Sequence, residues 1–399
     1  MKRFIIVVMD SVGCGALPDA DRYRSAGANT LGHIAASRPV RLPQLQALGL
    51  GNILPLPGVE PTPAPAAAWG KMAEQGAGMD TTCGHWEMAG LVLAQALPTY
   101  PQGFPPEVVS RLEAAFGTGI LGNCVASGTQ IIRQLGEEHV SSGKPIVYTS
   151  ADSVLQIAAH EKICPLERLY QMCGQAREIM QGPHGVGRVI ARPFLGESKA
   201  DFYRTGNRRD FSLTPPAHGL LQNVREAGWP VVSIGKIYDI FAGCHITDVL
   251  EGHDNSQSMS SLYQALRQYD QGLIFANFVD FDMKFGHRND VEGYAQALED
   301  FDAGLPRALA LLGEEDILVI TADHGNDPTS PGTDHNREYV PLLVCGPRVS
   351  PVELGIRPTF ADLGQTAAAY LGCTPLPAGE SFLARLGLSK RPAESFKKP

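Results

Sequence analysis

Three short apolar runs, each ending at a carboxylate, constrain the fold of this chain more than any other feature. The runs and the polar residues that follow them are Phe4 to Met9 with Asp10, Leu273 to Val279 with Asp280 and Asp282, and Ile317 to Ile320 with Asp323 and His324. Aliphatic and β-branched runs of this length are typical of strands that are buried on both faces. Ligands of parallel α/β sheets bind beyond the carboxyl ends of the strands. We therefore expect an α/β fold whose mainly parallel sheet, flanked by helices, carries these side chains at one edge.

Each strand end also has a simpler structural explanation. Asp10 alone is more typical of a helix cap, and a capped strand end with two solvated histidines would explain Asp323 to His335 equally well. The coincidence of three such strand ends with nearby imidazoles favours a metal site. Six side chains can contribute ligands: Asp10, Asp282, His287, Asp323, His324 and His335. Imidazole and carboxylate ligands suit zinc, manganese or iron, and six of them are enough for two metal ions.

Composition excludes several classes of protein. With 399 residues, 44% hydrophobic and 19% charged, the chain can bury a full core over two or three domains. A formal charge of -9 offers no basic surface for nucleic acid or an anionic membrane, and the apolar run before Asp10 is too short for a signal peptide or a membrane helix. The eight cysteines contain no CxxC pair, which indicates reduced thiols. We expect a cytoplasmic monomer without nucleic-acid or membrane partners.

The order of the predicted elements changes in the middle of the chain. After Pro98 the sequence predicts an α+β set, with helices at Pro105–Phe116 and Pro165–Gln181 and strands at Pro145–Thr149 and Val186–Pro193. The core pattern then resumes with strands at Pro230–Ile234 and Val340–Val344 and helices at Ser258–Tyr269, Asp290–Leu312 and Asp362–Leu371. Pro39–Pro65 lacks clean periodicity and is expected to be an ordered connection. We expect a discontinuous catalytic core, 1–97 and 217–399, with an inserted domain at 98–216.

Two further segments carry possible phosphate chemistry. Gly76 to Glu87 places Thr81 and Thr82 before an apolar segment, so either threonine can be a helix N-cap. Alternatively, a hydroxyl at a helix N-terminus is well placed to carry a phosphoryl group. The insertion holds a cluster of arginines, Arg188, Arg192, Arg204, Arg208 and Arg209. Arginine forks suit phosphate, although solvated surface arginines are the default explanation for any one of them.

Long motifs along the chain resemble the phosphopentomutases, a family of the alkaline phosphatase superfamily. The motifs are VVMDSVG (Val7–Gly13), GHWEMAGL (Gly84–Leu91), TSADSVLQIAAHE (Thr149–Glu161), RTGNRRDFSL (Arg204–Leu213), GKIYDIF (Gly235–Phe241), VDFDMKFGHRNDVEGY (Val279–Tyr294) and TADHGNDPTSPGTDH (Thr321–His335). This resemblance runs nearly end to end. It implies an alkaline-phosphatase-like core and a substrate-binding cap domain formed by the insertion.

The resemblance also implies an activity and a set of site residues. It implies an isomerase of nucleoside breakdown that interconverts α-D-ribose 1-phosphate and D-ribose 5-phosphate, and the 2-deoxy sugars, through a phosphothreonine and a pentose 1,5-bisphosphate. Two Mn²⁺ ions would be held by Asp10, Asp323 and His324, joined by Thr81, and by Asp282, His287 and His335. Ser150, Asp152, Arg204 and Lys236 would meet the sugar or its distal phosphate. A sugar bisphosphate, ribose 1,5-bisphosphate or glucose 1,6-bisphosphate, would phosphorylate Thr81.

The chain departs from the family pattern beside the nucleophile. Met79 stands where the family usually has lysine, and Cys83 stands where it has threonine. Thr81 is retained, and Thr82 is the alternative nucleophile. Three other functions compete with the mutase: a cofactor-independent phosphoglycerate mutase, a phosphatase, and a non-catalytic binding module that keeps the fold. A substrate panel distinguishes the mutase from a phosphoglycerate mutase. Slow loss of phosphate from the phosphoenzyme argues against a phosphatase, and turnover with manganese argues against a binding module.

Overall fold

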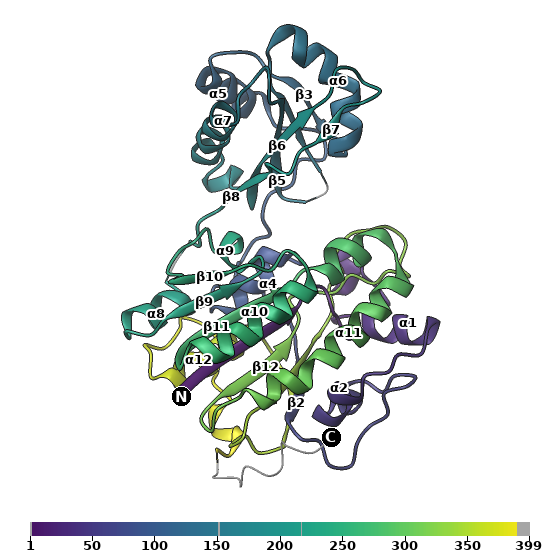
Figure 1. The fold of residues 1–399 in the computed structure, drawn as a ribbon, viewed down its shortest axis with the longest axis vertical. Coiled ribbons are helices and arrows are strands. Elements are labelled where there is room, and N and C mark those ends of the chain that lie inside the picture. Colours follow the sequence, from purple (N-terminus) through teal and green to yellow (C-terminus); the bar gives the residue numbers. More distant parts are fainter. Residues whose placement is uncertain (1, 151, 217, 389–399) are drawn as a thin grey trace. The chain divides into compact units, whose positions relative to one another are not determined.

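The chain forms two compact units, each with its own sheet (Figure 1). The computed structural model describes residues 2–150, 152–216 and 218–388. Met1–Ala96 and Pro215–Pro399 form the first unit, and Leu97–Thr214 form the second. Ala217, where the sequence analysis places the return to the core, lies outside the described residues.

The sheet of the first unit is mainly parallel and has eight strands within the part of the chain that the structure describes. Its strands, in spatial order, are β10 (Asp248–Leu250), β9 (Val231–Ile234), β11 (Gln271–Phe278), β1 (Lys2–Met9), β12 (Ile317–Thr321), β13 (Val340–Cys345), β2 (Ala68–Met72) and β14 (Glu353–Arg357). The strands from β10 to β12 are all parallel, whereas β13 is antiparallel to both of its neighbours, β12 and β2. The predicted α/β class with a mainly parallel sheet is therefore confirmed.

The three strands that end in carboxylates lie side by side at the centre of this sheet. Strand β1 pairs in parallel with β11 on one side and with β12 on the other, with Met9 opposite Phe278 and Val8 opposite Thr321. The carboxyl ends of the three strands therefore meet at one edge, as the apolar runs predict. Apart from Lys2 and Gln271 at their starts, all three strands are buried, which requires cover on both faces.

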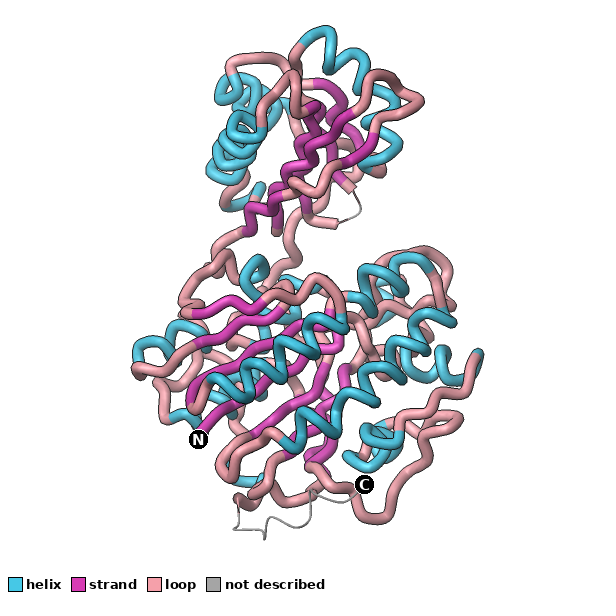
Figure 2. The backbone as a smooth tube through the Cα atoms, in the orientation of Figure 1, coloured by secondary structure: helices cyan, strands magenta, loops and turns pink. Residues whose placement is uncertain are grey.

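Helices of the first unit supply that cover. They are α1 (Thr30–Ser37), α2 (Pro43–Leu48), α3 (Leu50–Ile53), α4 (Thr81–Met88), α8 (Leu220–Glu226), α9 (Ile237–Ile240), α10 (Asn255–Gln268), α11 (Val291–Ala310) and α12 (Ala361–Leu371). Helix α10 packs on β9 and β11, and α12 packs on β1 (Figure 2). In α11 the residues at helical spacing, Tyr294, Leu298, Phe301 and Leu305, are buried as predicted.

One segment of the first unit differs from its expected form. Pro39–Pro65, expected as a connection, contains the short helices α2 and α3, and Pro43 occupies the first position of α2. Proline is well suited to that position because its missing N–H would have no intrahelical partner there. The absence of long-range periodicity therefore reflects the shortness of these helices.

In its described residues, the second unit has three α-helices that pack against a six-stranded sheet and enclose two hydrophobic cores. Its elements are α5 (Pro106–Phe116), β3 (Leu121–Val125), α6 (Gly128–Ser142), β4 (Ile146–Thr149), β5 (Val154–His160), α7 (Leu166–Ile179), β6 (Arg188–Leu195), β7 (Tyr203–Arg204) and β8 (Arg209–Ser212). One core lies between α5, α7 and the sheet, and the other lies beneath α6. Four of these elements were predicted within three residues at each end: α5, β4, α7 and β6.

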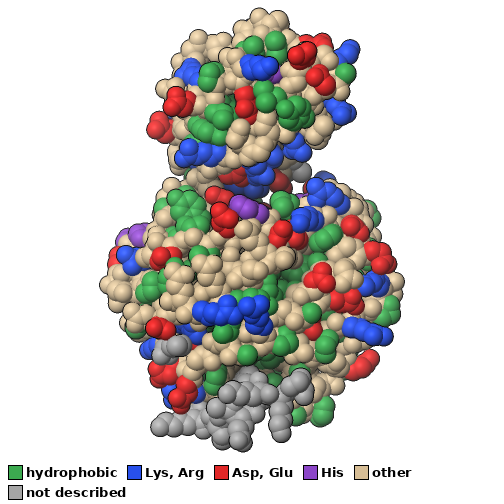
Figure 3. Space-filling model, in the orientation of Figure 1, with side chains coloured by type: hydrophobic (Ala, Val, Ile, Leu, Met, Phe, Trp, Pro, Cys, Tyr) green, Lys and Arg blue, Asp and Glu red, His purple; other side chains and the backbone are tan. Residues whose placement is uncertain are grey.

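Charged side chains of both signs are interspersed over the face of the molecule drawn in Figure 3. Among the helices that the structure describes, none is both long and apolar enough to cross a membrane.

Candidate metal centre and nucleophile helix

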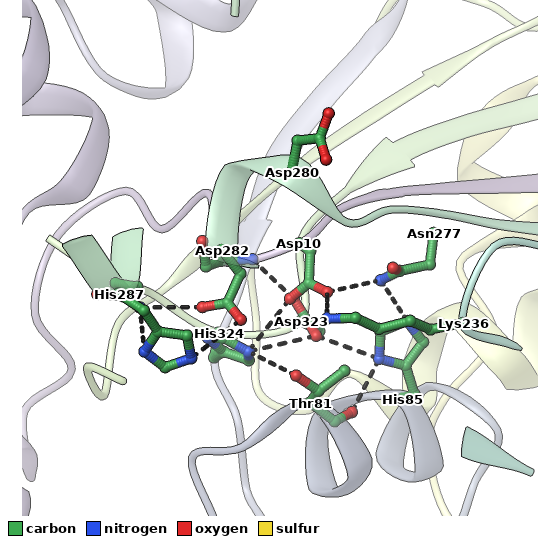
Figure 4. Close-up of polar contacts among 12 residues, drawn as sticks. Asp10, Thr81, His85, Lys236, Asn277, Asp280, Asp282, His287, Asp323 and His324 are labelled. Carbon is green, nitrogen blue, oxygen red and sulfur yellow. Dashed lines mark hydrogen bonds and ion pairs between the residues drawn. The ribbon is translucent and has the colours of Figure 1, made fainter. Parts of the chain in front are cut away.

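The six predicted ligands converge at the carboxyl edge of the central strands. Figure 4 labels all of them except His335. Ligand atoms of Asp10, Asp323 and His324 all lie within 4.8 Å of one another, and so do those of Asp282, His324 and His335. His287 joins the second group, with its Nε2 3.2 Å from Asp282 Oδ2. The resemblance assigned His324 to one metal only, whereas its position in this structure lies between the two groups.

Backbone geometry after β1 aims Asp323 into the site. Ser11 follows Asp10 and adopts a left-handed conformation with φ of 72°, which is uncommon for a residue other than glycine. In this conformation the Ser11 N–H donates to Asp323 Oδ1 at 3.0 Å, and its hydroxyl lies 2.9 Å from the Tyr294 hydroxyl. One oxygen of Asp323 is thereby held by the backbone, and Oδ2 faces the cluster.

Asp282 lies in a short π-helix, Phe281–Phe285, which begins three residues after the end of β11 at Phe278. Such π-helical turns are rare and occur frequently at functional sites. The Asn326 side chain donates to Asp282 Oδ1 at 2.9 Å and so fixes the carboxylate from the loop after β12. Asp280, two residues earlier, instead accepts hydrogen bonds from the Asn255 backbone and from Lys284, and it points away from the cluster (Figure 4).

Contacts between Nδ1 and backbone carbonyls orient the imidazoles of His287 and His324. His287 Nδ1 lies 2.6 Å from the Thr333 carbonyl, and His324 Nδ1 lies 3.0 Å from the Gly325 carbonyl. A carbonyl only accepts, so both Nδ1 atoms carry the proton and both Nε2 atoms face the carboxylates. This arrangement is the usual one for metal-ligating histidines. The His335 ring lies between the two, with ring centroids 4.0 Å from His324 and 4.9 Å from His287.

Three buried polar atoms in the cluster have no hydrogen-bond partner among the described residues, and they are the donor atoms a metal would use. They are Asp10 Oδ1, Asp323 Oδ2 and His335 Nε2. Leaving a carboxylate oxygen buried and unpaired costs free energy, so such atoms are rare unless something else binds them. The donor set and these atoms fit divalent cations.

The charges in the cluster are strongly coupled. Burial favours the neutral carboxyl of Asp10, but Lys236, whose ammonium lies 3.0 Å from Oδ2, and His324 outweigh it and hold the pKa of Asp10 well below its usual value. Burial likewise opposes ionisation of Asp282, yet His335 and His287 keep its pKa well below the usual value. For His324, burial lowers the pKa, but the carboxylates, Asp323 foremost, raise it well above its usual value. The site is therefore built to hold positive charge.

Glu338 fastens two of the ligand-bearing loops to each other. Its Oε2 accepts from the N–H groups of Gly15 and Thr30, both at 3.0 Å, and its Oε1 accepts from the Thr30 hydroxyl at 2.6 Å. The same hydroxyl accepts from the Asn326 N–H at 3.1 Å. Burial raises the pKa of Glu338 to about 7.

Helix α4 brings Thr81 to the cluster. The N-cap of α4 is Asp80, whose Oδ1 accepts from the N–H groups of Thr82 and Cys83 at 2.9 and 3.1 Å, so neither threonine is the cap. Thr81 Oγ1 lies 3.2 Å from His324 Nε2. Thr81 is partly exposed, whereas Thr82 is buried. Because Asp80 occupies two of the free helical amides, these amides are not available to a phosphoryl group on Thr81.

The residues after Thr82 fix α4 against the sheet. A Cβ on Gly84 would lie 2.2 Å from the Asp323 carbonyl oxygen, so only glycine allows the helix to approach this closely. The Trp86 indole donates to the Ile240 carbonyl at 3.1 Å. Glu87 accepts from the N–H groups of Gln75, Gly76 and Phe360 and from the Thr359 hydroxyl. The first turn of α4 therefore has little freedom to shift.

The predicted substrate residues fall on both units. Lys236 lies in the first unit beside Asp10, and Ser150, Asp152 and Arg204 lie in the second. Asp152 is 3.9 Å from the Arg188 guanidinium, and Arg204 is exposed on β7. Asp210 pairs with Arg188 and Arg208, which accounts for part of the arginine cluster without a ligand.

Sequence reasoning missed several residues that shape the site. Ser11, Asn326 and Glu338 are polar loop residues without a distinctive pattern. Asn277 did carry a signal, since it is a buried amide inside the otherwise apolar run Leu273–Val279. Its Nδ2 donates to Asp10 Oδ2 at 3.2 Å.

Comparison with known proteins gives the family. The profile of the Metalloenzyme superfamily matches residues 2–375. A phosphopentomutase of Desulfitobacterium hafniense (strain DSM 10664 / DCB-2) is 56% identical over 388 residues, 97% of this chain and 100% of that protein. One of Caldanaerobacter subterraneus subsp. tengcongensis is 54% identical over 389 residues, 97% and 99% of the two chains. A solved phosphoglycerate mutase of Leishmania mexicana covers 95% of this chain and 97% of its own, with 13% identity and a TM-score of 0.49. That likeness is too distant to assign a function.

The superfamily profile and the cluster of aspartates and histidines at the sheet edge define the class of protein, a metalloenzyme with an alkaline-phosphatase-like core. Such an enzyme binds divalent metal ions. Identity above 50% over nearly the full length of both chains then shows that this chain belongs to the phosphopentomutase family. It is accordingly an isomerase.

Proposed function

We propose that this enzyme interconverts α-D-ribose 1-phosphate and D-ribose 5-phosphate, and the 2-deoxyribose equivalents, through a phosphoryl group carried on Thr81. The observation that most directly supports the proposal is the position of the Thr81 hydroxyl, 3.2 Å from His324 Nε2 at the rim of the six-ligand cluster. Thr82 is the alternative carrier, but its side chain is buried, which favours Thr81.

The reaction consists of two phosphoryl transfers. In the first, the free hydroxyl of a pentose monophosphate attacks phosphothreonine 81, its proton leaves, and the bond between phosphorus and Oγ1 breaks to give a pentose 1,5-bisphosphate. In the second, Oγ1 attacks the other phosphate, and the sugar oxygen that leaves takes up a proton. The phosphothreonine is restored, and no phosphate is lost. A sugar bisphosphate, ribose 1,5-bisphosphate or glucose 1,6-bisphosphate, starts the cycle by phosphorylating Thr81.

Residues of the chain divide the remaining work. Asp10, Asp282, His287, Asp323, His324 and His335 are proposed to hold two Mn²⁺ ions. Ions bound there would neutralise phosphoryl oxygens and lower the pKa of the attacking hydroxyl. Asp80 fixes the first turn of α4 and with it the direction of Thr81. The positive charge of Lys236, beside Asp10, adds to the attraction for phosphate.

Ser150, Asp152 and Arg204 are proposed to bind the sugar or its distal phosphate, together with Lys236. Loss of a charge-assisted contact of Arg204 to phosphate should weaken substrate binding. We expect Arg204→Ala to raise KM with a smaller effect on kcat. Arg111 provides a matched control, because it is an exposed arginine of α5 in the same unit that lies outside these motifs. Arg111→Ala should leave KM unchanged.

Phosphorus NMR of the manganese-loaded enzyme with a panel of substrates tests the proposed function. We expect ribose 1-phosphate and ribose 5-phosphate to interconvert and Thr81→Ala to abolish the conversion. Accumulation of inorganic phosphate would instead identify a phosphatase, and conversion of 3-phosphoglycerate would identify a phosphoglycerate mutase. Absence of any turnover would favour a binding module.

A further inference from the structure

His85 is a fully buried histidine that belongs to no metal group, yet it contacts the machinery on three sides (Figure 4). Its Nδ1 lies 2.8 Å from the Thr81 carbonyl and 3.2 Å from Asp323 Oδ2. Its Nε2 lies 3.3 Å from Nδ2 of Asn277. The ring stacks on Phe275, with 5.6 Å between ring centroids.

The partners of His85 determine which ring nitrogen carries the proton. Nδ2 of Asn277 can only donate, and its two hydrogens have two acceptors, His85 Nε2 and Asp10 Oδ2. The opposite amide orientation would place a carbonyl oxygen against the Asp10 carboxylate. His85 Nε2 therefore accepts, and the ring donates from Nδ1, which faces the Thr81 carbonyl and Asp323.

We propose that His85 is a positioning residue that links the nucleophile helix to the metal-binding carboxylates. Its Nδ1–H faces both the carbonyl of Thr81 and Asp323 Oδ2, an oxygen that also lies 3.4 Å from His324 Nε2. Through Nε2 and Asn277 it is connected to Asp10. The His85 ring thereby sets the distance from Thr81 to the carboxylates of Asp10 and Asp323. The proposal rests on the proposed function for the role of Thr81, but its effect on metal binding can be measured without turnover.

A purely structural role for His85 makes different predictions. A ring that only fills space beside Phe275 would tolerate any polar side chain of similar size, with a loss of stability but no change at the metal site. A positioning ring requires a donor at the place of Nδ1. The amide nitrogen of asparagine reaches roughly the position of Nδ1, whereas that of glutamine reaches the position of Nε2. His85→Asn and His85→Gln therefore separate the two roles.

The experiment measures Mn²⁺ affinity by isothermal titration calorimetry on the full chain, together with kcat, KM and thermal stability. We expect His85→Gln to bind Mn²⁺ about 10- to 100-fold more weakly, the usual effect of losing a partner of a metal ligand. His85→Gln should lower kcat at saturating Mn²⁺ by a larger factor than it raises KM. His85→Asn should bind Mn²⁺ at least tenfold more tightly than His85→Gln. His139→Gln is the matched control, since His139 is also buried and its Nδ1 contacts a backbone carbonyl, that of Lys144, at 2.7 Å.

A measurement on the unaltered protein keeps the proposal testable if a variant fails to fold. Long-range proton–nitrogen NMR of histidine-labelled, metal-free protein reports which nitrogen of each ring is protonated, and through-bond assignment in the unaltered protein identifies the His85 signal. The Nε2–H form would overturn the proposal, and so would equal Mn²⁺ affinities for His85→Asn and His85→Gln. If instead Mn²⁺ affinity follows the prediction but Thr81 is never phosphorylated, the positioning role stands and the proposed function fails.

Discussion

A buried ion pair at the N-terminal ends of β1 and β12 provides a direct test of the fold. Arg3, at the start of β1, and Asp316, just before β12, are both fully buried. The Arg3 N–H and Nε donate to the two oxygens of Asp316 at 3.1 and 3.0 Å, and Nη2 contacts Asp316 as well. The remaining guanidinium hydrogens reach the carbonyls of Leu266, Tyr269 and Leu311. Every donor of this buried cation is thus satisfied.

Removing only one partner of this ion pair should lower the free energy of unfolding strongly, because the other charge stays buried without its counter-ion. Asp316→Leu leaves a buried guanidinium without its counter-ion, a change worth about 3–5 kcal/mol of the free energy of unfolding. Arg3→Met leaves the buried Asp316 carboxylate without its counter-ion, held only by the N–H groups of residue 3 and Gly313, and removes the donors to three carbonyls, with a loss of similar size. In the double variant neither charge is left alone, so we expect a coupling energy of about 2 kcal/mol. The metal site should be unaffected, because the pair lies at the opposite ends of β1 and β12.

Urea unfolding followed by tryptophan fluorescence measures these free energies. Trp69, Trp86 and Trp229 are the three tryptophans of the chain, and all lie in the first unit, so the signal reports the unit that contains the pair. Arg348→Ala, which removes a partly exposed contact to Glu315, is the control and should cost less than about 1 kcal/mol. Single variants that each lose less than about 1 kcal/mol, or a double variant that loses the sum of both, would refute the reasoning.

Two further predictions concern charge and metal in the first unit. The pKa of Glu338, raised to about 7, means that the folded state keeps a proton that the unfolded chain loses from about pH 4.5 upward, so this residue weakens folding as pH rises to about 7. At about 1.4 kcal/mol per pH unit, Glu338 should lower the free energy of unfolding by about 3 kcal/mol between about pH 4.5 and pH 7. Glu338→Gln has no carboxyl group there, so this part of the pH dependence should be absent from the variant when both proteins are measured with a chelator. Equal pH dependence of unfolding in both proteins would contradict this. Mn²⁺ at a hundred times its Kd should raise the free energy of unfolding by about 2.7 kcal/mol for each bound ion, whereas Asp282→Asn together with His335→Asn should halve the gain. An unchanged gain in that variant would contradict the assigned ligands.

The parts of this structure that the sequence predicts are those encoded by local patterns. Apolar runs placed β1, β11 and β12, and because the carboxyl ends of parallel strands share an edge, they also brought Asp10, Asp282 and Asp323 together. The helical spacing of Tyr294, Leu298, Phe301 and Leu305 placed α11. In each case burial of one kind of side chain leaves a period in the sequence.

Other features depend on contacts between segments that are far apart, which leave no local pattern. Nothing in Val340–Cys345 indicates that β13 runs antiparallel to β12. Gly70 argues against a strand, yet β2 requires glycine there because a Cβ would lie 2.4 Å from the Gly355 carbonyl oxygen of β14. The same limit applies to His324, whose spacing after Asp323 cannot reveal that it also lies beside Asp282 and His335.

The N-cap of α4 could have been predicted correctly. Asp80 precedes the two threonines, and aspartate is at least as strong an N-cap as threonine. Assigning the cap to Asp80 leaves Thr81 at the first helical position without a structural role for its hydroxyl, which strengthens the functional interpretation.

The central claim, a phosphoryl group carried on Thr81, is tested most directly by the intact mass of the protein before and after incubation with Mn²⁺ and ribose 1,5-bisphosphate, followed by sequencing of the modified peptide. The account predicts a gain of one phosphoryl group on Thr81, absent from Thr81→Ala and retained in Thr82→Val. A phosphoryl group on Thr82, or no gain of mass by a protein that still interconverts the pentose phosphates, would contradict it.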